Sequence, residues 1–185
     1  KSRQTVLDFN AKTPNYRVVH ENLDDMSKVT SAMTYQKGGW TLHMLRQRMG
    51  DDRFWAGIRA YYQTHMNSTA LTADFRHAME VAAGEPLGPF FDQWLYRGGV
   101  PRLSGTWSWN AAAKTVTVDL TQTQTGAPFQ IPVEIGLQLA GGASRVERID
   151  MTGASAHAVF NVATEPTSLV IDPSVKLLAA AEIVK

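Results

Sequence analysis

The spacing of apolar residues changes once along this chain, close to Pro101. Before that residue, apolar side chains recur at steps of three and four, which is typical of α-helices that bury one face. After it, they alternate with polar residues, which is typical of strands in a half-buried antiparallel sheet. The pattern therefore predicts an α+β protein with two domains. These are an α-helical domain of about four helices at residues 1–101 and a small antiparallel β-sandwich at residues 102–185.

One predicted helix, residues 35–50, organises the first domain. Gly50 follows its last apolar residue, where a positive φ ends the helix without a Cβ clash. Gly38 and Gly39 stand near its start, although each glycine weakens a helix by about 1 kcal/mol relative to alanine. We therefore expect another backbone to pack closely against this turn, beside the phenol of Tyr35. The predicted buried face consists of Trp40, Met44, Leu45 and Met49.

Other helices are predicted before and after it. A first helix over residues 3–11 is ended by Pro14, because proline cannot continue the hydrogen-bond ladder. Residues 15–30 lack a clear period and are predicted to form a long irregular connection. Asp51 or Asp52 is predicted to cap the next helix, and Thr72 the one after it. The apolar faces of the three later helices are Phe54, Ile58, Tyr61 and Tyr62; Phe75, Ala78, Met79 and Ala82; and Phe90, Phe91, Trp94 and Leu95.

The clearest predicted strand covers residues 131–139, where five apolar residues alternate with other residues. Pro132 falls on the outward set, which favours a sheet edge or a strand start because proline donates no hydrogen bond. Gly141 and Gly142 predict a hairpin turn after this strand. Similar alternation predicts six or seven short strands in all, including residues 107–109, 115–121, 145–151, 156–162 and 168–171.

Composition excludes some classes of partner. The chain has 185 residues, of which 44% are hydrophobic, and a formal net charge of +1. No cluster of Lys and Arg with interleaved aromatics is present, so no nucleic-acid partner is predicted. No apolar run approaches the roughly 18 residues of a spanning helix, so no membrane partner is predicted. Cysteine is absent, which excludes disulfides and thiolate metal sites. Because the sequence begins at Lys1 and not at Met, we expect it to have been cut from a longer chain.

The sequence offers few groups for catalysis or for metal binding. A helical zinc site of the metallopeptidase type needs His-Glu-x-x-His, because imidazoles four residues apart can share one ion. The nearest string begins at His20 and has Asp24 in place of the second histidine, so no metal site is predicted. The sequence also lacks the Gly-x-Ser-x-Gly motif of a nucleophilic serine. Tyr35 remains, since a phenol keeps its proton at neutral pH and can donate to an oxyanion. Taken alone, however, it is better explained as a packed helix residue.

Several short segments stand in order along the chain, beginning with Tyr-Gln-Lys-Gly at residues 35–38. Together they resemble the aminopeptidase N family of zinc metallopeptidases, whose Tyr-x-Lys-Gly string the first of them matches. Residues 90–101 resemble its Phe-x-x-Trp … Gly-x-Pro signature, which precedes a β-sandwich. One departure is Gly39, where alanine is usual in the family. The other matching segments are residues 49–54, 61–65, 72–75 and Asp172-Pro173.

By this resemblance, the chain covers the second half of the family's catalytic domain and the β-sandwich that follows. The family tyrosine that stabilises the tetrahedral oxyanion falls on Tyr35, while Lys37 and Gly38 are expected to be structural. The resemblance implies zinc in the full-length parent, where it activates the attacking water. It implies no metal site in these residues, which lack the family's Gly-x-Met-Glu-Asn and His-Glu-x-x-His. The expected partners are the N-terminal remainder of the parent chain and a peptide substrate, and the fragment alone is expected to be inactive.

Two alternatives stay open at this point. The parent could be a non-catalytic, aminopeptidase-like scaffold, because the zinc ligands that would decide this lie outside the sequence. The chain could instead be a helical module joined to a β-sandwich that binds peptide or glycan. Trp107 and Trp109 would then form the binding platform, although their alternation places them better in the sandwich core.

Overall fold

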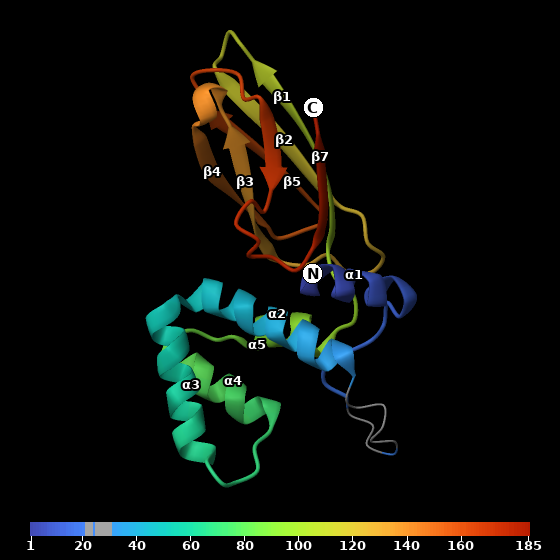
Figure 1. The fold of residues 1–185 in the computed structure, drawn as a ribbon, viewed down its shortest axis with the longest axis vertical. Helices are drawn as coiled ribbons and strands as arrows, with labels where there is room; N and C mark the ends of the chain where they lie inside the picture. The colour runs from blue at the N-terminus through green and yellow to red at the C-terminus, as the bar shows by residue number, and fades with distance from the viewer. Residues whose placement is uncertain (21–23, 25–30) are drawn as a thin grey trace. The chain divides into compact units, whose positions relative to one another are not determined.

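A computed structural model describes residues 1–20, 24 and 31–185, which form two compact units, residues 1–99 and 100–185 (Figure 1). The first unit contains the helices and the second contains two small, mostly antiparallel sheets. The predicted α+β class, with helices before strands, is therefore confirmed. Of the connection predicted at residues 15–30, residues 21–23 and 25–30 lie outside the described residues.

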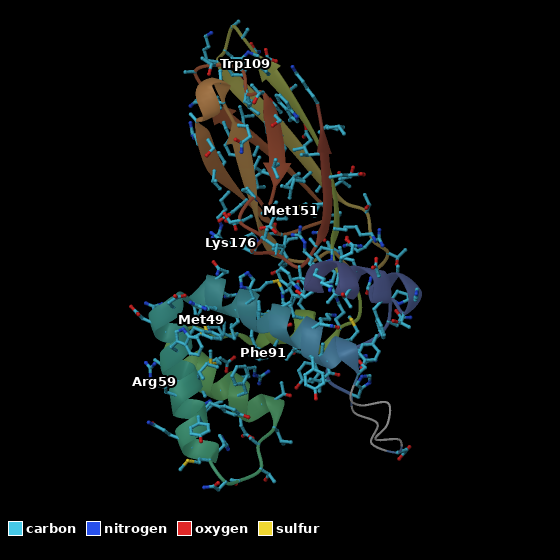
Figure 2. All side chains as sticks on the ribbon, in the orientation of Figure 1. Met49, Arg59, Phe91, Trp109, Met151 and Lys176 are labelled. Atoms are coloured by element: carbon cyan, nitrogen blue, oxygen red, sulfur yellow. The ribbon has the colours of Figure 1, made fainter. Side chains whose placement is uncertain are left out.

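In the helical unit, α2 is the central element and packs against α1, α3 and η2, while α3 packs along α4. Its predicted face is largely confirmed, because Met44, Leu45 and Met49 are buried and Trp40 is half-buried. Figure 2 labels Met49 at the end of α2 and Phe91 at the end of α5, both of them core residues. The elements are α1 (Ser2–Lys12), α2 (Ala32–Met49), α3 (Asp51–His65), α4 (Thr72–Ala83), α5 (Gly88–Phe91) and the π-helix η2 (Asp92–Tyr96).

Helices α3 and α4 approach closely at Gly57. A Cβ atom added there would lie 2.6 Å from the sulfur of Met79, so a larger residue would require the Met79 side chain to move. The approach centres the buried face of α3 on Phe54 and Gly57. Tyr62 lies off that face and is 64% exposed, so its predicted place in the stripe is wrong.

The close backbone approach predicted at Gly38 and Gly39 is also wrong. Among the described residues, nothing lies within 4 Å of a Cβ added at either glycine. The tight packing occurs instead at Gly98, where an added Cβ would lie 2.7 Å from backbone atoms of Asn15. The glycine pair near the start of α2 therefore remains without a packing explanation in the described chain.

The predicted helix caps are wrong in two places. Gly50, with φ +79°, is the single residue between α2 and α3, so Asp51 is already inside α3 and cannot cap it. The Asp51 carboxylate instead pairs with Arg46, at 2.7 and 2.8 Å. At the next helix, Thr72 is the first helical residue, and the Asp74 carboxylate accepts the N–H of Leu71 at 2.8 Å.

The β unit has one sheet in the order β5-β2-β1-β7 and another in the order β4-β3-β6. All pairs are antiparallel except β1 and β7, which run parallel. Strand β7 was not predicted, because its alternation is weak. The strands are β1 (Arg102–Asn110), β2 (Thr115–Gln122), β3 (Ile131–Gln138), β4 (Ser144–Met151), β5 (Ser155–Asn161), β6 (Ser168–Ile171) and β7 (Ala180–Val184).

Strand β3 carries the hydrophobic centre of its sheet. Of its five predicted inward residues, Ile131, Val133, Ile135 and Leu137 are buried, whereas Leu139 lies just past the end of β3 and is half-buried. Pro132 lies at the strand start, before the part of β3 that β6 pairs with, so its predicted position is confirmed. The short 3₁₀ turn η3 (Ala140–Gly142) links β3 to β4, with positive φ at Gly141 and Gly142, and confirms the predicted hairpin.

A buried amide holds the loop between β2 and β3. The side chain of Gln122 donates from Nε2 to the carbonyl oxygens of Phe129, at 2.7 Å, and Gly153, at 3.0 Å. Its Oε1 accepts the N–H of Phe129 at 2.8 Å. Gln122 therefore satisfies three backbone groups from one buried position.

Candidate functional site

Tyr35 is the fourth residue of α2 and points its ring out of the helical unit. The residue is 73% exposed, which is unusually high for an aromatic residue in a folded protein. The hydroxyl can therefore reach a ligand without any rearrangement of the helices. A Tyr35 ring sealed in the core would have been incompatible with a catalytic role, and the structure does not have that arrangement.

The start of α2, one turn before Tyr35, is fixed by a capping box. Ser31 Oγ accepts the N–H of Met33 at 3.1 Å, and Thr34 Oγ1 accepts the N–H of Ser31 at 3.2 Å. The Tyr16 hydroxyl lies 2.6 Å from Ser31 Oγ and links the cap to the segment that follows α1. These contacts satisfy N–H groups that a helix start leaves unpaired.

Lys37, two residues further on, is almost completely buried, with 1% of its surface exposed. Its Nζ donates to the carbonyl oxygen of Gly99 at 3.0 Å and to that of Arg97 at 3.3 Å. Burial lowers the pKa of the ammonium from its ordinary value of 10.5 to about 8, and the nearby Arg97 charge contributes in the same direction. At neutral pH the group is therefore still mainly protonated and acts as a charged donor.

The turn that receives Lys37 is itself tied to the rest of the helical unit. The carbonyl oxygen of Leu95, near the end of η2, accepts the N–H groups of Val18 and Val19, each at 3.1 Å. Gly98 packs against the backbone of Asn15, and Gly99 has φ +87°. Residues 95–99 thus form a junction that joins η2 to α2 and to residues 14–19.

Among residues 1–20, 24 and 31–185, no group of three or more His, Asp or Glu could hold a metal ion. His20, the first residue of the string that resembles a zinc motif, packs its ring edge-on against Tyr16 at 5.0 Å between centroids. Within the same described residues, every helix is too short or too polar to span a bilayer.

The two tryptophans of β1 do not form an open platform. Trp107 is 7% exposed and belongs to the core, with the Lys185 ammonium 5.2 Å from its ring centroid. Trp109 is half-buried, and the Lys114 ammonium lies 5.9 Å from its ring centroid. Their surroundings indicate packing rather than ligand binding.

A helical unit followed by two small sheets is also the fold of a solved aminopeptidase structure. The crystal structure of Legionella pneumophila aminopeptidase A in complex with aspartic acid has the same fold over 98% of this chain. The TM-score is 0.74 at 15% sequence identity, and the match covers 23% of that protein.

The chain belongs to peptidase family M1, since residues 1–94 match the Peptidase family M1 domain. The resemblance to the aminopeptidase N family is thereby confirmed, and the M1 family uses zinc. Aminopeptidase N of Escherichia coli is 24% identical over 153 residues, which is 80% of this chain and 18% of that protein. Aminopeptidase N of Lactococcus lactis is 36% identical over 74 residues, which is 40% of this chain and 9% of that protein. The chain thus spans less than a fifth of the length of these relatives.

The sequence singles out Tyr35 as the candidate site residue but does not predict the burial of Lys37. A signal for that burial was present, because Lys37, Thr41, Met44 and Leu45 follow one another at helical spacing on the buried face of α2. Because a lysine is rarely fully buried, residue type argues against Lys37 as a core position and favours Trp40 as the start of the buried face.

Proposed function

We propose that this chain is the C-terminal part of a zinc-dependent aminopeptidase, which hydrolyses N-terminal peptide bonds. Residues 1–101 would be the second half of the catalytic domain, and residues 102–185 the β-sandwich that follows it. Tyr35 would donate its phenolic O–H to the oxygen of the scissile carbonyl as negative charge develops there. Membership of peptidase family M1 supports the peptide substrate.

The exposure of Tyr35 on an otherwise fixed turn is the observation that carries this role. Its neighbours are held by the capping box at Ser31 and by the two hydrogen bonds of Lys37. A donor that is already in place when charge develops needs no reorganisation, which is where such groups gain their effect. An exposed tyrosine without this support would lose part of that benefit to its own motion.

The described residues do not fit a zinc ion, since they lack a group of three ligands. We therefore propose that the zinc ligands come from a preceding part of a longer parent chain, which is the expected partner of this one. Residues 1–185 alone should then hydrolyse no aminoacyl substrate, with or without added zinc. Zinc-dependent release of an N-terminal amino acid by this purified chain would contradict the proposal.

The role of Tyr35 is tested by Tyr35→Phe in the full-length enzyme. Loss of one oxyanion donor typically lowers kcat by about 10²–10³-fold, and KM should change little because the contact forms mainly in the transition state. Tyr62→Phe is a matched control, because Tyr62 is 64% exposed on α3 and should leave kcat unchanged. A Tyr35→Phe enzyme with wild-type kcat would exclude the tyrosine from the reaction.

A further inference from the structure

We infer that Lys37 is a positioning residue for Tyr35, because its two hydrogen bonds to the carbonyl oxygens of Arg97 and Gly99 hold the turn of α2 that carries the phenol. The inference rests on the proposed function. The inference goes beyond that function, because it assigns a part in catalysis to Lys37, a buried residue that would not itself contact the substrate.

Residues 35 and 37 take opposite sides of one helical turn. Two steps along an α-helix rotate a side chain by about 200°, so a residue that faces solvent has its second neighbour facing inward. The exposures agree, since Tyr35 is 73% exposed and Lys37 is 1% exposed. The inner side chain is thus anchored in the protein while the outer one is presented to the substrate side.

The anchor reaches a part of the chain that is itself fixed. Lys37 lies 60 residues before Arg97 and 62 before Gly99 in sequence, so its hydrogen bonds join distant segments. The receiving turn is packed through Gly98 against Asn15 and bonded through Leu95 to residues 18 and 19. A displacement of the Tyr35 turn along or about the axis of α2 would stretch both Lys37 bonds.

Filling space does not explain a lysine at this position. An apolar side chain would avoid the desolvation that lowers the pKa of the ammonium. The lysine instead supplies directed N–H donors to two carbonyl oxygens, which an apolar residue cannot do. Hydrogen bonds fix position and angle within narrow limits, and an oxyanion donor must lie within about 2.7–3.1 Å of its target.

The test is a double-mutant cycle in the full-length enzyme with Lys37→Met and Tyr35→Phe, measured as kcat. Misplacement of a catalytic group by about 1 Å can cost about 10²-fold. We therefore expect Lys37→Met to lower kcat by about 10–100-fold when Tyr35 is present, and by less than about 2-fold in the Tyr35→Phe background. Lys12→Met, at an exposed position of α1, is the control and should leave kcat unchanged in both backgrounds.

Each other outcome has a distinct meaning. Equal losses in both backgrounds, or no loss in either, would overturn the positioning role. If Tyr35→Phe alone has wild-type kcat, the proposed function of Tyr35 has failed; if only Lys37→Met is without effect, the present inference alone has failed. Should Lys37→Met not fold, Lys37→Gln takes its place in the cycle, because its shorter neutral side chain retains an N–H donor. Lys37→Gln should then lower kcat by a smaller factor than Lys37→Met, and again mainly when Tyr35 is present.

Discussion

Replacing Lys37 with methionine removes a buried ammonium and keeps most of the side-chain volume. Two opposing effects follow in the folded chain. The carbonyl oxygens of Arg97 and Gly99 lose their donor, which destabilises the fold, and the cost of burying a charge disappears, which stabilises it. Deprotonation of the lysine relieves the desolvation cost and also weakens its donation to the two carbonyl oxygens, so stability changes with pH by the net of these two effects.

The size and sign of that change follow from the pKa of Lys37. Its fall from 10.5 to about 8 corresponds to about 3 kcal/mol, at about 1.4 kcal/mol per pKa unit. Below pH 8 both folded and unfolded chains hold the proton, so the full penalty applies. Between pH 8 and pH 10.5 the unfolded chain keeps a proton that the folded chain releases, so the penalty is relieved and stability rises with pH.

The measured quantity is the unfolding free energy of the unaltered chain minus that of Lys37→Met. It should rise by about 2 to 3 kcal/mol from pH 7 to pH 10, because other titrating groups are common to both proteins. Urea unfolding followed by far-ultraviolet circular dichroism at 222 nm reports on the helical unit. Lys12→Met provides the control and should give a difference that does not vary with pH, since Lys12 is exposed. A flat difference for Lys37→Met would show that the ammonium is not desolvated, and a falling one that the two carbonyls overcompensate its burial.

Two further predictions concern the packing. Gly39→Ala should stabilise the chain by about 0.5–1 kcal/mol, since alanine is the better helix former and the position is open. Gly98→Ala should destabilise it by about 1–3 kcal/mol, because the added Cβ would meet the backbone of Asn15. Equal effects of the two substitutions on thermal unfolding would contradict this prediction. Gln122→Leu should destabilise the β unit by about 2–4 kcal/mol, because the hydrogen bonds of Gln122 to the N–H and C=O of Phe129 are lost. Hydrogen exchange at the Phe129 amide should accelerate, and unchanged exchange would show that water replaces the side chain.

Elements that bury one face could be predicted from sequence, because burial imposes a period. This holds for Met44, Leu45 and Met49 on α2 and for the alternating residues of β3. Helix caps could not be predicted in this way, because several groups compete for the same hydrogen-bond partner. Asp51 is a good capping residue by type, yet its carboxylate pairs with the Arg46 guanidinium. Because only one residue separates α2 from α3, Asp51 also lies inside α3 and not before it. Strand β7 was not predicted because its residues alternate only weakly between half-buried and exposed positions.

The candidate site divides in the same way. The role proposed for Tyr35 comes from a motif, since a short string of residue types can be compared directly. The anchor of its turn was missed, because a lysine is usually placed at the surface and its two acceptors are carbonyl groups, which every residue has. Close backbone packing at glycines was also not predictable from residue type. Two adjacent glycines suggested a close approach, but the crowded position is Gly98, and residue type alone does not distinguish them.

The parallel pairing of β7 with β1 imposes an order on biosynthesis. Strand β1 is the first of its unit to leave the ribosome and β7 is the last, so the side of β1 that β7 covers stays open until residues 180–184 have emerged. An open strand side offers N–H and C=O groups to other nascent chains. A translation product that stops short of Ala180 therefore keeps a template for aggregation, even though all of its helices have already been made.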